Sequence, residues 1–267
     1  MRRIGWDDGR VPTQLTVERH VAGLGSAMAA FIRYADRAGL EAAVPTCPDW
    51  TLRDLVAHQG MVHRWATALL RGLRAEDPEM WQREGRAQPD PLSWLGSGAA
   101  ELILTIRRSP DDLRAPVFLN DAPGPRAFWA RRQCHETTMH AVDAQAAALG
   151  RPPEAAEVGW IGEDLALDGL DELLTGFLTR RRERLRTDQE STLLLAPAGA
   201  GSWWQLSLGP HPVRTTRHAG TLPAELADRA DWMLTGPPVE LYLRLWNRGS
   251  PVLPEVDWPH AAAVTWR

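Results

Sequence analysis

A glutamate and a histidine four positions apart, Glu136 and His140, are the residues of this 267-residue chain whose types and spacing best suit chemistry. On an α-helix that spacing places both side chains on one face, one turn apart. A carboxylate and an imidazole arranged in this way can bind one divalent metal ion. His58, on a separate predicted helix, is the best candidate for a third ligand. Three protein ligands leave coordination positions open, which is typical of a reactive metal site rather than a structural one.

The same helix face carries further polar side chains beside this pair. At a rotation of about 100° per residue, Arg132, Glu136, His140 and Asp143 fall within an arc of about 80°. His135 lies one residue from Glu136 and therefore faces elsewhere. The pattern thus predicts one face that offers a cation, two metal ligands and a carboxylate one turn beyond them.

Other interpretations of these residues stay open at the level of spacing. Glu136 and His140 can form a surface pair, and His58 can be a hydrogen-bonded core histidine. His63 lies about 140° around the helix from His58, so these two do not easily share an ion. The sequence has no Gly-x-Ser-x-Gly motif, no glycine-rich phosphate loop and no His-Glu-x-x-His zinc motif. Among enzyme classes, a metal site is therefore favoured over a serine triad.

Four long amphipathic segments are expected to position these residues. Apolar side chains recur at helical spacing in four segments: residues 13–40, 52–74, 91–108 and 126–148. Thr51 is a good N-cap with Asp54 three residues later, and Gly150 before two prolines ends the last helix. Residues 75–90 are polar and contain two prolines, so we expect a connection there. The pattern predicts a four-helix bundle over residues 1–152.

The second half of the chain has a different character. One further helix is expected over residues 155–186, so that residues 153–190 form a connecting helix with an arginine-rich, solvated end. Short β-prone stretches separated by glycine and proline follow: residues 192–196, 203–208, 213–217 and 231–235. A last helix is expected over residues 237–246. Residues 191–267 are therefore predicted to form a small α+β domain, and the whole fold is predicted to be mainly α.

The bulk composition excludes several classes of protein. Hydrophobic residues are 44% and charged residues 24%, as in ordinary globular proteins. The net charge of −4 gives no electrostatic case for binding nucleic acid or an anionic membrane. All basic residues are arginine, which excludes a lysine Schiff base. Two cysteines, Cys47 and Cys134, give no disulfide framework, and no apolar run approaches about 18 residues. We therefore expect a cytoplasmic protein.

Two segments of the sequence resemble a known family. Residues 44–58 (VPTCPDWTLRDLVAH) and 129–143 (WARRQCHETTMHAVD) are similar to segments of the mycothiol-dependent maleylpyruvate isomerase family. A looser match over residues 231–238 and 243–248 extends the resemblance over nearly the whole chain. The resemblance implies a DinB-like metal-binding four-helix bundle followed by a small C-terminal domain that resembles sterol-carrier folds.

The resemblance also implies roles for individual residues. In that family a histidine of an Asp-Leu-x-x-His motif and a Glu-x-x-x-His pair hold the metal, which corresponds to His58, Glu136 and His140. An arginine near the end of the last domain contributes to the site, and Arg248 is the nearest match, with Arg244 as an alternative. Zinc is the expected ion, although the trio also suits other divalent metals. Mycothiol is the thiol that the resemblance implies.

Two further roles are hypotheses that rest on the shared helix face. Arg132 can bind a carboxylate of the thiol or of the acceptor and so take part in catalysis. Asp143 can orient His140 or contact the amine or sugar of the thiol. Both residues are therefore predicted to be catalytic and cofactor-binding.

The function expected from these observations is metal- and mycothiol-dependent. A transferase or isomerase would activate a low-molecular-weight thiol for attack on a small electrophile. One alternative is maleylpyruvate cis–trans isomerisation itself. Another is a non-catalytic protein that binds a small molecule and holds a structural metal.

Overall fold

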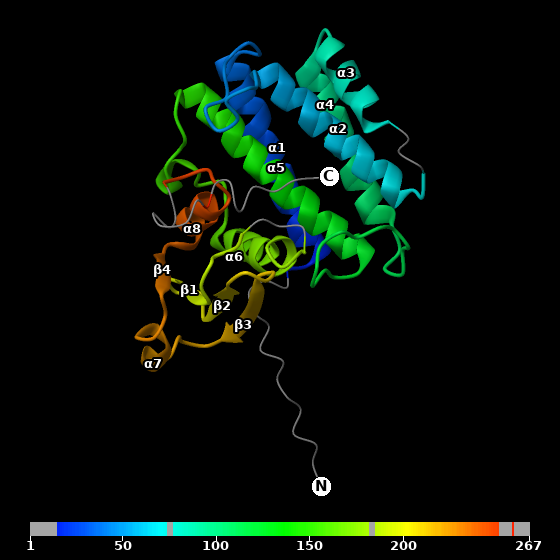
Figure 1. Ribbon diagram of the computed structural model, residues 1–267. Coiled ribbons are helices and arrows are strands. Elements are labelled where there is room, and N and C mark those ends of the chain that lie inside the picture. Colours follow the sequence, from blue (N-terminus) through cyan, green and yellow to red (C-terminus); the bar gives the residue numbers. More distant parts are fainter. Residues whose placement is uncertain (1–14, 74–76, 182–184, 251–257, 259–267) are drawn as a thin grey trace.

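The computed structural model describes residues 15–73, 77–181, 185–250 and Trp258, and its first half contains a four-helix bundle (Figure 1). The bundle helices are α1 (Val17–Ala38), α2 (Leu52–Leu70), α4 (Pro91–Arg108) and α5 (Pro125–Leu149). Helix α5 contacts α1 and α2, and α4 contacts the same two helices. The four predicted helices are thus confirmed, although their ends differ by a few residues.

Local capping signals determine where the bundle helices start and stop. The Thr51 hydroxyl accepts a hydrogen bond from the Asp54 N–H, and the Asp54 carboxylate accepts one from the Thr51 N–H. This reciprocal capping box fixes the first turn of α2, about two turns before His58. Gly150 adopts the left-handed conformation with φ 71° and ends α5.

A short helix, α3 (Pro78–Ala87), packs against α2 and α4 where the sequence predicted a connection. That prediction was wrong for a local reason. Asp77 accepts a hydrogen bond from the Met80 N–H and caps the helix, and Pro78 occupies its first turn. Proline is tolerated at that position because the missing N–H would have no partner in the helix.

The second half of the chain contains a small sheet of four strands. The strands are β1 (Ser191–Pro197), β2 (Ser202–Leu208), β3 (Arg214–Ala219) and β4 (Trp232–Gly236). Their order is β3-β2-β1-β4, in which β1 is antiparallel to β2 and parallel to β4. Helix α8 (Pro238–Leu245) follows β4, as predicted. The one-turn helix α7 (Ala224–Ala227) was not predicted.

The segment predicted as one helix over residues 155–186 is interrupted. It contains a 3₁₀ turn (Ala155–Glu157), α6 (Glu163–Asp171) and a π-helical turn (Glu172–Phe177). Glycines at 159 and 162 separate the first two pieces, and glycine disfavours a continuous helix. This segment belongs to the second core of the molecule, because its apolar residues pack with α8 and the sheet.

Helix α5 joins the two apolar cores of the protein. Its Cys134 and Ala141 pack inside the bundle, whereas its Met139 and Val142 belong to the core shared by α6, α8 and the sheet. Every residue of α5 from 128 to 146 is buried, including its charged residues. The mainly α fold with a small α+β part is therefore confirmed, and its central helix is the one that carries Glu136 and His140 (Figure 1).

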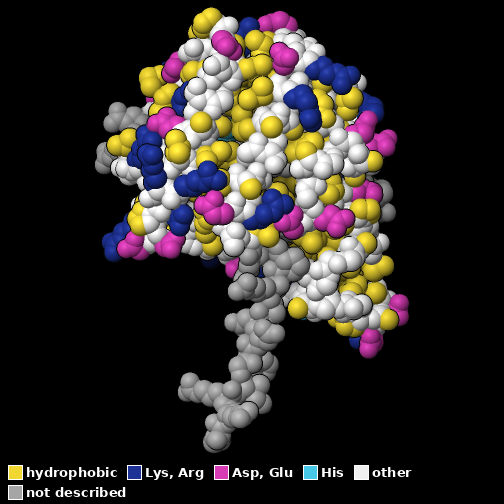
Figure 2. Space-filling view, turned by 180° about the vertical axis from the view of Figure 1, so that it is seen from behind, with side chains coloured by type: hydrophobic (Ala, Val, Ile, Leu, Met, Phe, Trp, Pro, Cys, Tyr) yellow, Lys and Arg dark blue, Asp and Glu magenta, His cyan; other side chains and the backbone are white. Residues whose placement is uncertain are grey.

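One face of the molecule and the helices of the described residues bear on charge and on membrane insertion. On the face shown in Figure 2, arginine and acidic side chains are interspersed among apolar and neutral atoms. Among the described residues, no helix combines the length and the apolar character needed to cross a membrane.

Candidate metal centre

The three predicted metal ligands lie together between α2 and α5. The Oε1 atom of Glu136 is 3.4 Å from Nε2 of His140 and 3.7 Å from Nε2 of His58. The two imidazole rings meet edge to face, with centroids 5.1 Å apart. One ligand atom from each residue lies within 4.8 Å of the others. The trio thus forms one cluster of two nitrogens and one carboxylate oxygen.

The donor set of this cluster fits a divalent ion. Oε1 of Glu136 is buried and has no hydrogen-bond partner among the described residues, because both imidazole nitrogens lie beyond ordinary hydrogen-bond length. A buried carboxylate oxygen without a partner is costly, and a cation between it and two nitrogens would satisfy it. Two histidines and one carboxylate are a ligand set known from catalytic zinc sites.

A carboxylate behind His140 fixes the orientation of its ring. Asp143 Oδ2 lies 2.8 Å from Nδ1 of His140, which leaves Nε2 directed at the cluster. Arg248 donates two hydrogen bonds to the same carboxylate, at 2.9 and 2.8 Å, and Thr46 donates one at 2.6 Å. This is the carboxylate–histidine arrangement that orients metal-bound histidines.

Charge interactions hold the two carboxylates of the centre in their ionised form. Burial would raise the pKa of Glu136, but its contacts with His140 and His58 hold that pKa well below its ordinary value. Burial opposes ionisation of Asp143 as well, and Arg248 and His140 keep its pKa low. Burial would lower the pKa of His140, yet the hydrogen bond with Asp143 and the nearby Glu136 carboxylate raise it to about 9. Without an ion the His140 imidazolium is therefore held between two carboxylates, and an ion that binds at Nε2 would replace its proton.

Two side chains border the cluster on the α2 side. The ring centroid of Trp50, just before α2, lies 4.9 Å from that of His58 and 6.3 Å from that of His140. Cys47 is half-buried and donates a weak hydrogen bond to Asp143 at 3.8 Å. Burial raises the pKa of the Cys47 thiol to about 12, so this thiol is not a ready nucleophile.

Arg132 lies on the predicted helix face but is enclosed by protein. Its side chain is fully buried, and it donates to Oε2 of Glu136 at 3.2 Å and to Glu172. Arg248 reaches the centre through Asp143, whereas its alternative Arg244 lies 3.5 Å from Glu240 on α8.

The two histidines expected to face away from the centre do so. His63 contacts Gln59 and Thr137 inside the bundle, and burial lowers its pKa to about 3. Nδ1 of His135 lies 2.8 Å from the Tyr242 hydroxyl. Both side chains are core residues here.

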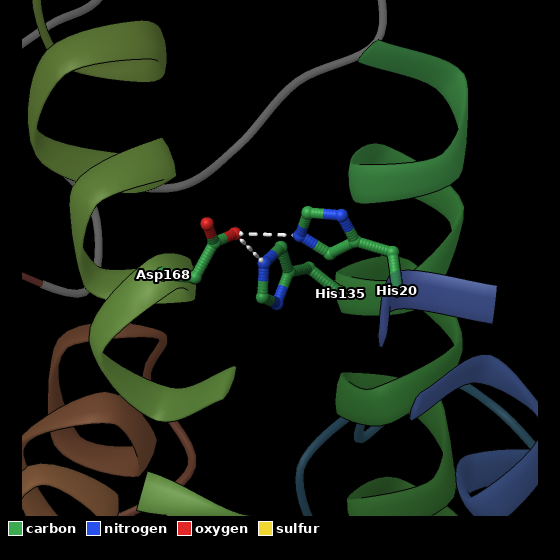
Figure 3. Close-up of side chains that lie close together, drawn as sticks. All are labelled: His20, His135 and Asp168. Atoms are coloured by element: carbon green, nitrogen blue, oxygen red, sulfur yellow. Dashed lines mark hydrogen bonds and ion pairs between the residues drawn. The ribbon is translucent and has the colours of Figure 1, made fainter. Parts of the chain in front are cut away.

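A second cluster of possible ligand atoms lies on the other side of α5, and sequence reasoning missed it. His20, His135 and Asp168 meet between α1, α5 and α6 (Figure 3). Oδ1 of Asp168 is 3.0 Å from Nε2 of His20, 2.7 Å from Nε2 of His135, and accepts a hydrogen bond from Arg131 at 2.8 Å. Because a guanidinium already occupies this oxygen and would repel a cation, we assign the cluster as a hydrogen-bond network.

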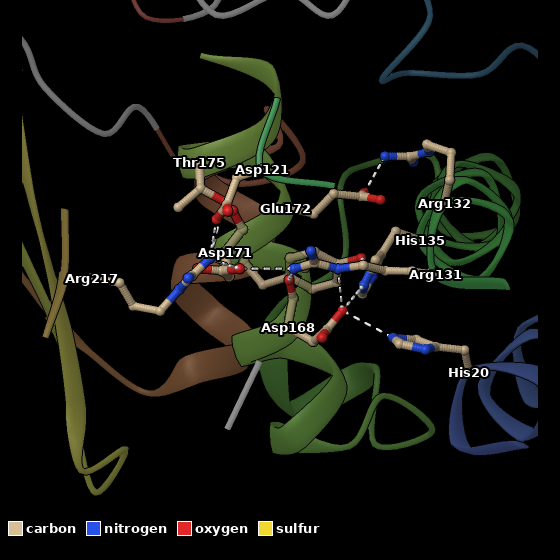
Figure 4. Close-up of polar contacts among 12 residues, drawn as sticks. His20, Asp121, Arg131, Arg132, His135, Asp168, Asp171, Glu172, Thr175 and Arg217 are labelled. Atoms are coloured by element: carbon tan, nitrogen blue, oxygen red, sulfur yellow. Dashed lines mark hydrogen bonds and ion pairs between the residues drawn. The ribbon is translucent and has the colours of Figure 1, made fainter. Parts of the chain in front are cut away.

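No local pattern in the sequence announces this network, since His20 and Asp168 are 148 positions apart. It continues through Asp171, which accepts hydrogen bonds from Arg217 of β3 (Figure 4). Asp171 also accepts one from Trp204 of β2. Buried Arg131 of α5 and half-buried Arg217 of β3 thus face buried carboxylates of the α6 segment, and the network joins the bundle to the sheet.

A helical bundle with a His–Glu–His cluster on facing helices, attached to a small α+β unit, defines a class of bundle proteins with a candidate metal centre. Comparison with family models identifies the particular family. Residues 21–145 match the model of the mycothiol maleylpyruvate isomerase N-terminal domain, and residues 164–265 match that of the MDMPI C-terminal domain. The chain belongs to the mycothiol maleylpyruvate isomerase family.

Two solved structures share the fold of this chain. A crystal structure of the mycothiol-dependent maleylpyruvate isomerase matches with a TM-score of 0.57 at 15% identity, over 90% of this chain and 92% of that chain. A histidine-to-alanine mutant of that isomerase matches with the same TM-score and coverage, at 14% identity. At such low identity these matches show the fold alone. No curated protein matches the chain.

Proposed function

We propose that this protein is a metal- and mycothiol-dependent enzyme that activates a thiol for attack on a small electrophile. The observation that carries this proposal is the buried, unpartnered Oε1 of Glu136, which lies between Nε2 of His58 and Nε2 of His140. Membership of the mycothiol maleylpyruvate isomerase family supports mycothiol as the thiol.

In this proposal His58, Glu136 and His140 hold the ion, and zinc is the expected metal. The ion, when bound, lowers the pKa of a thiol, so that the sulfur is a nucleophilic thiolate near neutral pH. Two nitrogens and one oxygen also suit other divalent metals, so the identity of the ion is a prediction that metal analysis must test.

The other residues of the centre act on the ligands. Asp143 holds His140 by its Nδ1 and keeps Nε2 directed at the cluster. Arg248 and Thr46 fix the Asp143 carboxylate in turn. The contacts of Arg132 support a role in holding Glu136. Binding of a carboxylate of the thiol or of the acceptor by Arg132 stays a prediction. Direct contact between Asp143 and the thiol stays a prediction as well.

The reaction outcome is proposed at the level of class. Addition of the thiol to a carbon–carbon double bond, rotation about the resulting single bond and elimination of the thiol would give an isomerase. Retention of the sulfur on the acceptor would give a transferase. The family name makes maleylpyruvate the first acceptor to assay.

Metal analysis of the purified protein tests the centre directly. We expect about one divalent ion per chain, and loss of that ion in the His58→Ala and His140→Ala variants. The exposed His211→Ala variant is the matched control and should retain the ion. A wild-type protein that takes up no divalent ion would exclude the metal-dependent function.

A thiol panel tests the cosubstrate separately. Maleylpyruvate and other small electrophiles are assayed with mycothiol, glutathione or cysteine. We expect turnover with mycothiol and little with the other two thiols. Equal rates with all three would remove mycothiol from the proposal and leave the metal. A protein that binds the ion but turns over no electrophile would instead support the non-catalytic alternative.

A further inference from the structure

The guanidinium of Arg132 bridges two carboxylates that belong to different parts of the fold. One is Glu136 of α5, whose Oε2 accepts from Nη2 at 3.2 Å. The other is Glu172, at the end of α6, which accepts from Nη1 (Figure 4). Arg132 is fully buried and Glu172 is 1% exposed. A carboxylate outside the metal centre is therefore joined to a predicted metal ligand through one buried cation.

The π-helical turn after α6 forms around this cation. Glu172 and Phe177 are five positions apart, which on an α-helix would place them about 140° from each other. In the π-helical turn Leu178 donates to the carbonyl of Leu173, five residues earlier, at 2.9 Å. The wider turn brings both side chains to Arg132, whose Cζ atom is 5.1 Å from the Phe177 ring centroid. π-Helical turns of this kind are frequent at functional sites.

The charges around Arg132 have a direct consequence for a cation at the centre. Glu136 offers Oε1 to the cluster while its Oε2 is held by Arg132. Glu172 supplies a second negative charge, which neutralises the guanidinium. Without that charge, a buried cation would draw Glu136 more strongly and repel the metal ion, and such effects are large where water is excluded.

We propose that Glu172 is a positioning residue that raises the divalent-ion affinity of the centre by neutralising Arg132. The inference rests on the proposed metal site of His58, Glu136 and His140. Glu172 does not contact the trio in this account, and its effect passes through the guanidinium to Glu136.

Metal titration of the full chain tests this role. Zn²⁺ and Co²⁺ affinities are measured for the wild-type protein and for Glu172→Gln, and we expect the variant to bind each ion about 10- to 100-fold more weakly, as for other partners of metal ligands. The visible spectrum of bound Co²⁺ should also change, because Arg132 would draw the Glu136 carboxylate away from the ion. The double variant Arg132→Met/Glu172→Gln removes both charges and should recover most of the lost affinity.

The Asp168→Asn variant is the control, because Asp168 lies one turn earlier on the same segment and pairs with Arg131 instead. It should lower stability without changing the Co²⁺ spectrum or the affinity. Equal affinity in Glu172→Gln and wild type would overturn the inference, as would equal losses in Asp168→Asn or a further loss in the double variant. A wild-type protein that binds neither ion would reject the metal site itself, and with it this role.

Discussion

Neighbouring residues of α5 make separate contacts because consecutive side chains of a helix point about 100° apart. Arg131 and His135 contact Asp168, whereas Arg132 and His140 contact Glu136. The spacing of four residues selects the side of the helix in both cases. A buried charge is stable only with a partner, so both faces carry paired charges. The candidate metal centre and the hydrogen-bond network therefore share one helix backbone without sharing side chains.

At the residue scale, Asp143 is expected to control the affinity of the centre through His140. Asp143→Asn should weaken Zn²⁺ binding by about 10- to 100-fold, because an amide holds the imidazole less firmly and removes a buried negative charge. Competition with a chelating dye measures the change. The Asp164→Asn variant breaks the half-exposed pair with Arg19 and serves as control, with unchanged affinity. Equal affinity in Asp143→Asn and wild type would exclude the orienting role.

His63 makes a prediction about stability and pH. Burial lowers its pKa to about 3 in the folded chain, while the unfolded chain titrates near 6.5. The unfolded state therefore binds more protons at this residue between pH 3 and 6.5. The contribution of His63 to the free energy of unfolding is thus complete above pH 6.5 and falls as the pH drops toward 3. From the difference between the two pKa values, the stability that His63 loses on acidification is at most about 5 kcal/mol.

Urea unfolding of His63→Gln between pH 7 and pH 4 tests this pH dependence. The variant should lose less stability on acidification than the wild-type protein, because glutamine does not titrate. His211→Ala, at an exposed position, should keep the wild-type slope. The same slope in all three proteins would mean that His63 does not contribute.

At the element scale, the same helix start signal, aspartate followed by proline, occurs at two helices, of which only one was predicted. Asp90 with Pro91 begins α4, which was predicted, and Asp77 with Pro78 begins α3, which was not. The α3 segment is short and mostly polar, so its apolar periodicity is weak and the prolines dominated the interpretation. The π-helical turn at Glu172–Phe177 could not be predicted either, since it follows from contacts with α5 rather than from local propensity.

Alanine is expected to have opposite effects on stability at a tightly packed glycine of α2 and at an open glycine of α1. Trp94 lies between Gly60 of α2 and Gly85 of α3, and a Cβ atom at Gly60 would be 2.0 Å from its indole. Gly60→Ala should therefore cost about 1–3 kcal/mol of stability through overpacking. At Gly25 of α1 a Cβ atom meets nothing within 4 Å, so Gly25→Ala should gain about 0.5–1 kcal/mol.

Urea denaturation of Gly60→Ala, Gly25→Ala and the wild-type protein measures the change in the free energy of unfolding for each variant. The indole has little room to move, because its Nε1 donates to Glu84 at 3.0 Å and Arg64 stacks on its ring at 3.6 Å. A stabilised Gly60→Ala variant would show that Trp94 can be displaced and that α3 is loosely held.

At the scale of the whole molecule, a contact could be predicted from the sequence only where a local motif or helical spacing indicated it. The trio of His58, Glu136 and His140 followed from helical spacing together with family resemblance, and the structure brings these residues together. Arg248 meets Asp143 across 105 positions, and spacing alone gave no reason to pair them. The buried contacts of α6 were missed entirely, because each joins segments that only the tertiary fold makes neighbours.

Asp171 is the point at which these long-range contacts converge, and its replacement should uncouple the sheet from the bundle. It accepts from Arg131 of α5, Arg217 of β3 and Trp204 of β2. Asp171→Asn removes one carboxylate partner from buried Arg131 and from half-buried Arg217. Each arginine keeps a second carboxylate, so the loss should cost about 3 kcal/mol, the low end for a broken buried pair. Hydrogen exchange should then accelerate in β1–β3 while α2 keeps its protection, because the loss falls on the sheet side of the network.

The matched control for this uncoupling is Asp121→Asn. Asp121 contacts the same Arg217 at 2.8 Å but is more than half exposed, so its loss should cost no more than about 1 kcal/mol and leave exchange in the strands unchanged. If Asp171→Asn instead accelerates exchange equally in α2 and in the strands, the two cores unfold as one unit. In that case α5, which contributes side chains to both cores, couples them without help from the ion pairs.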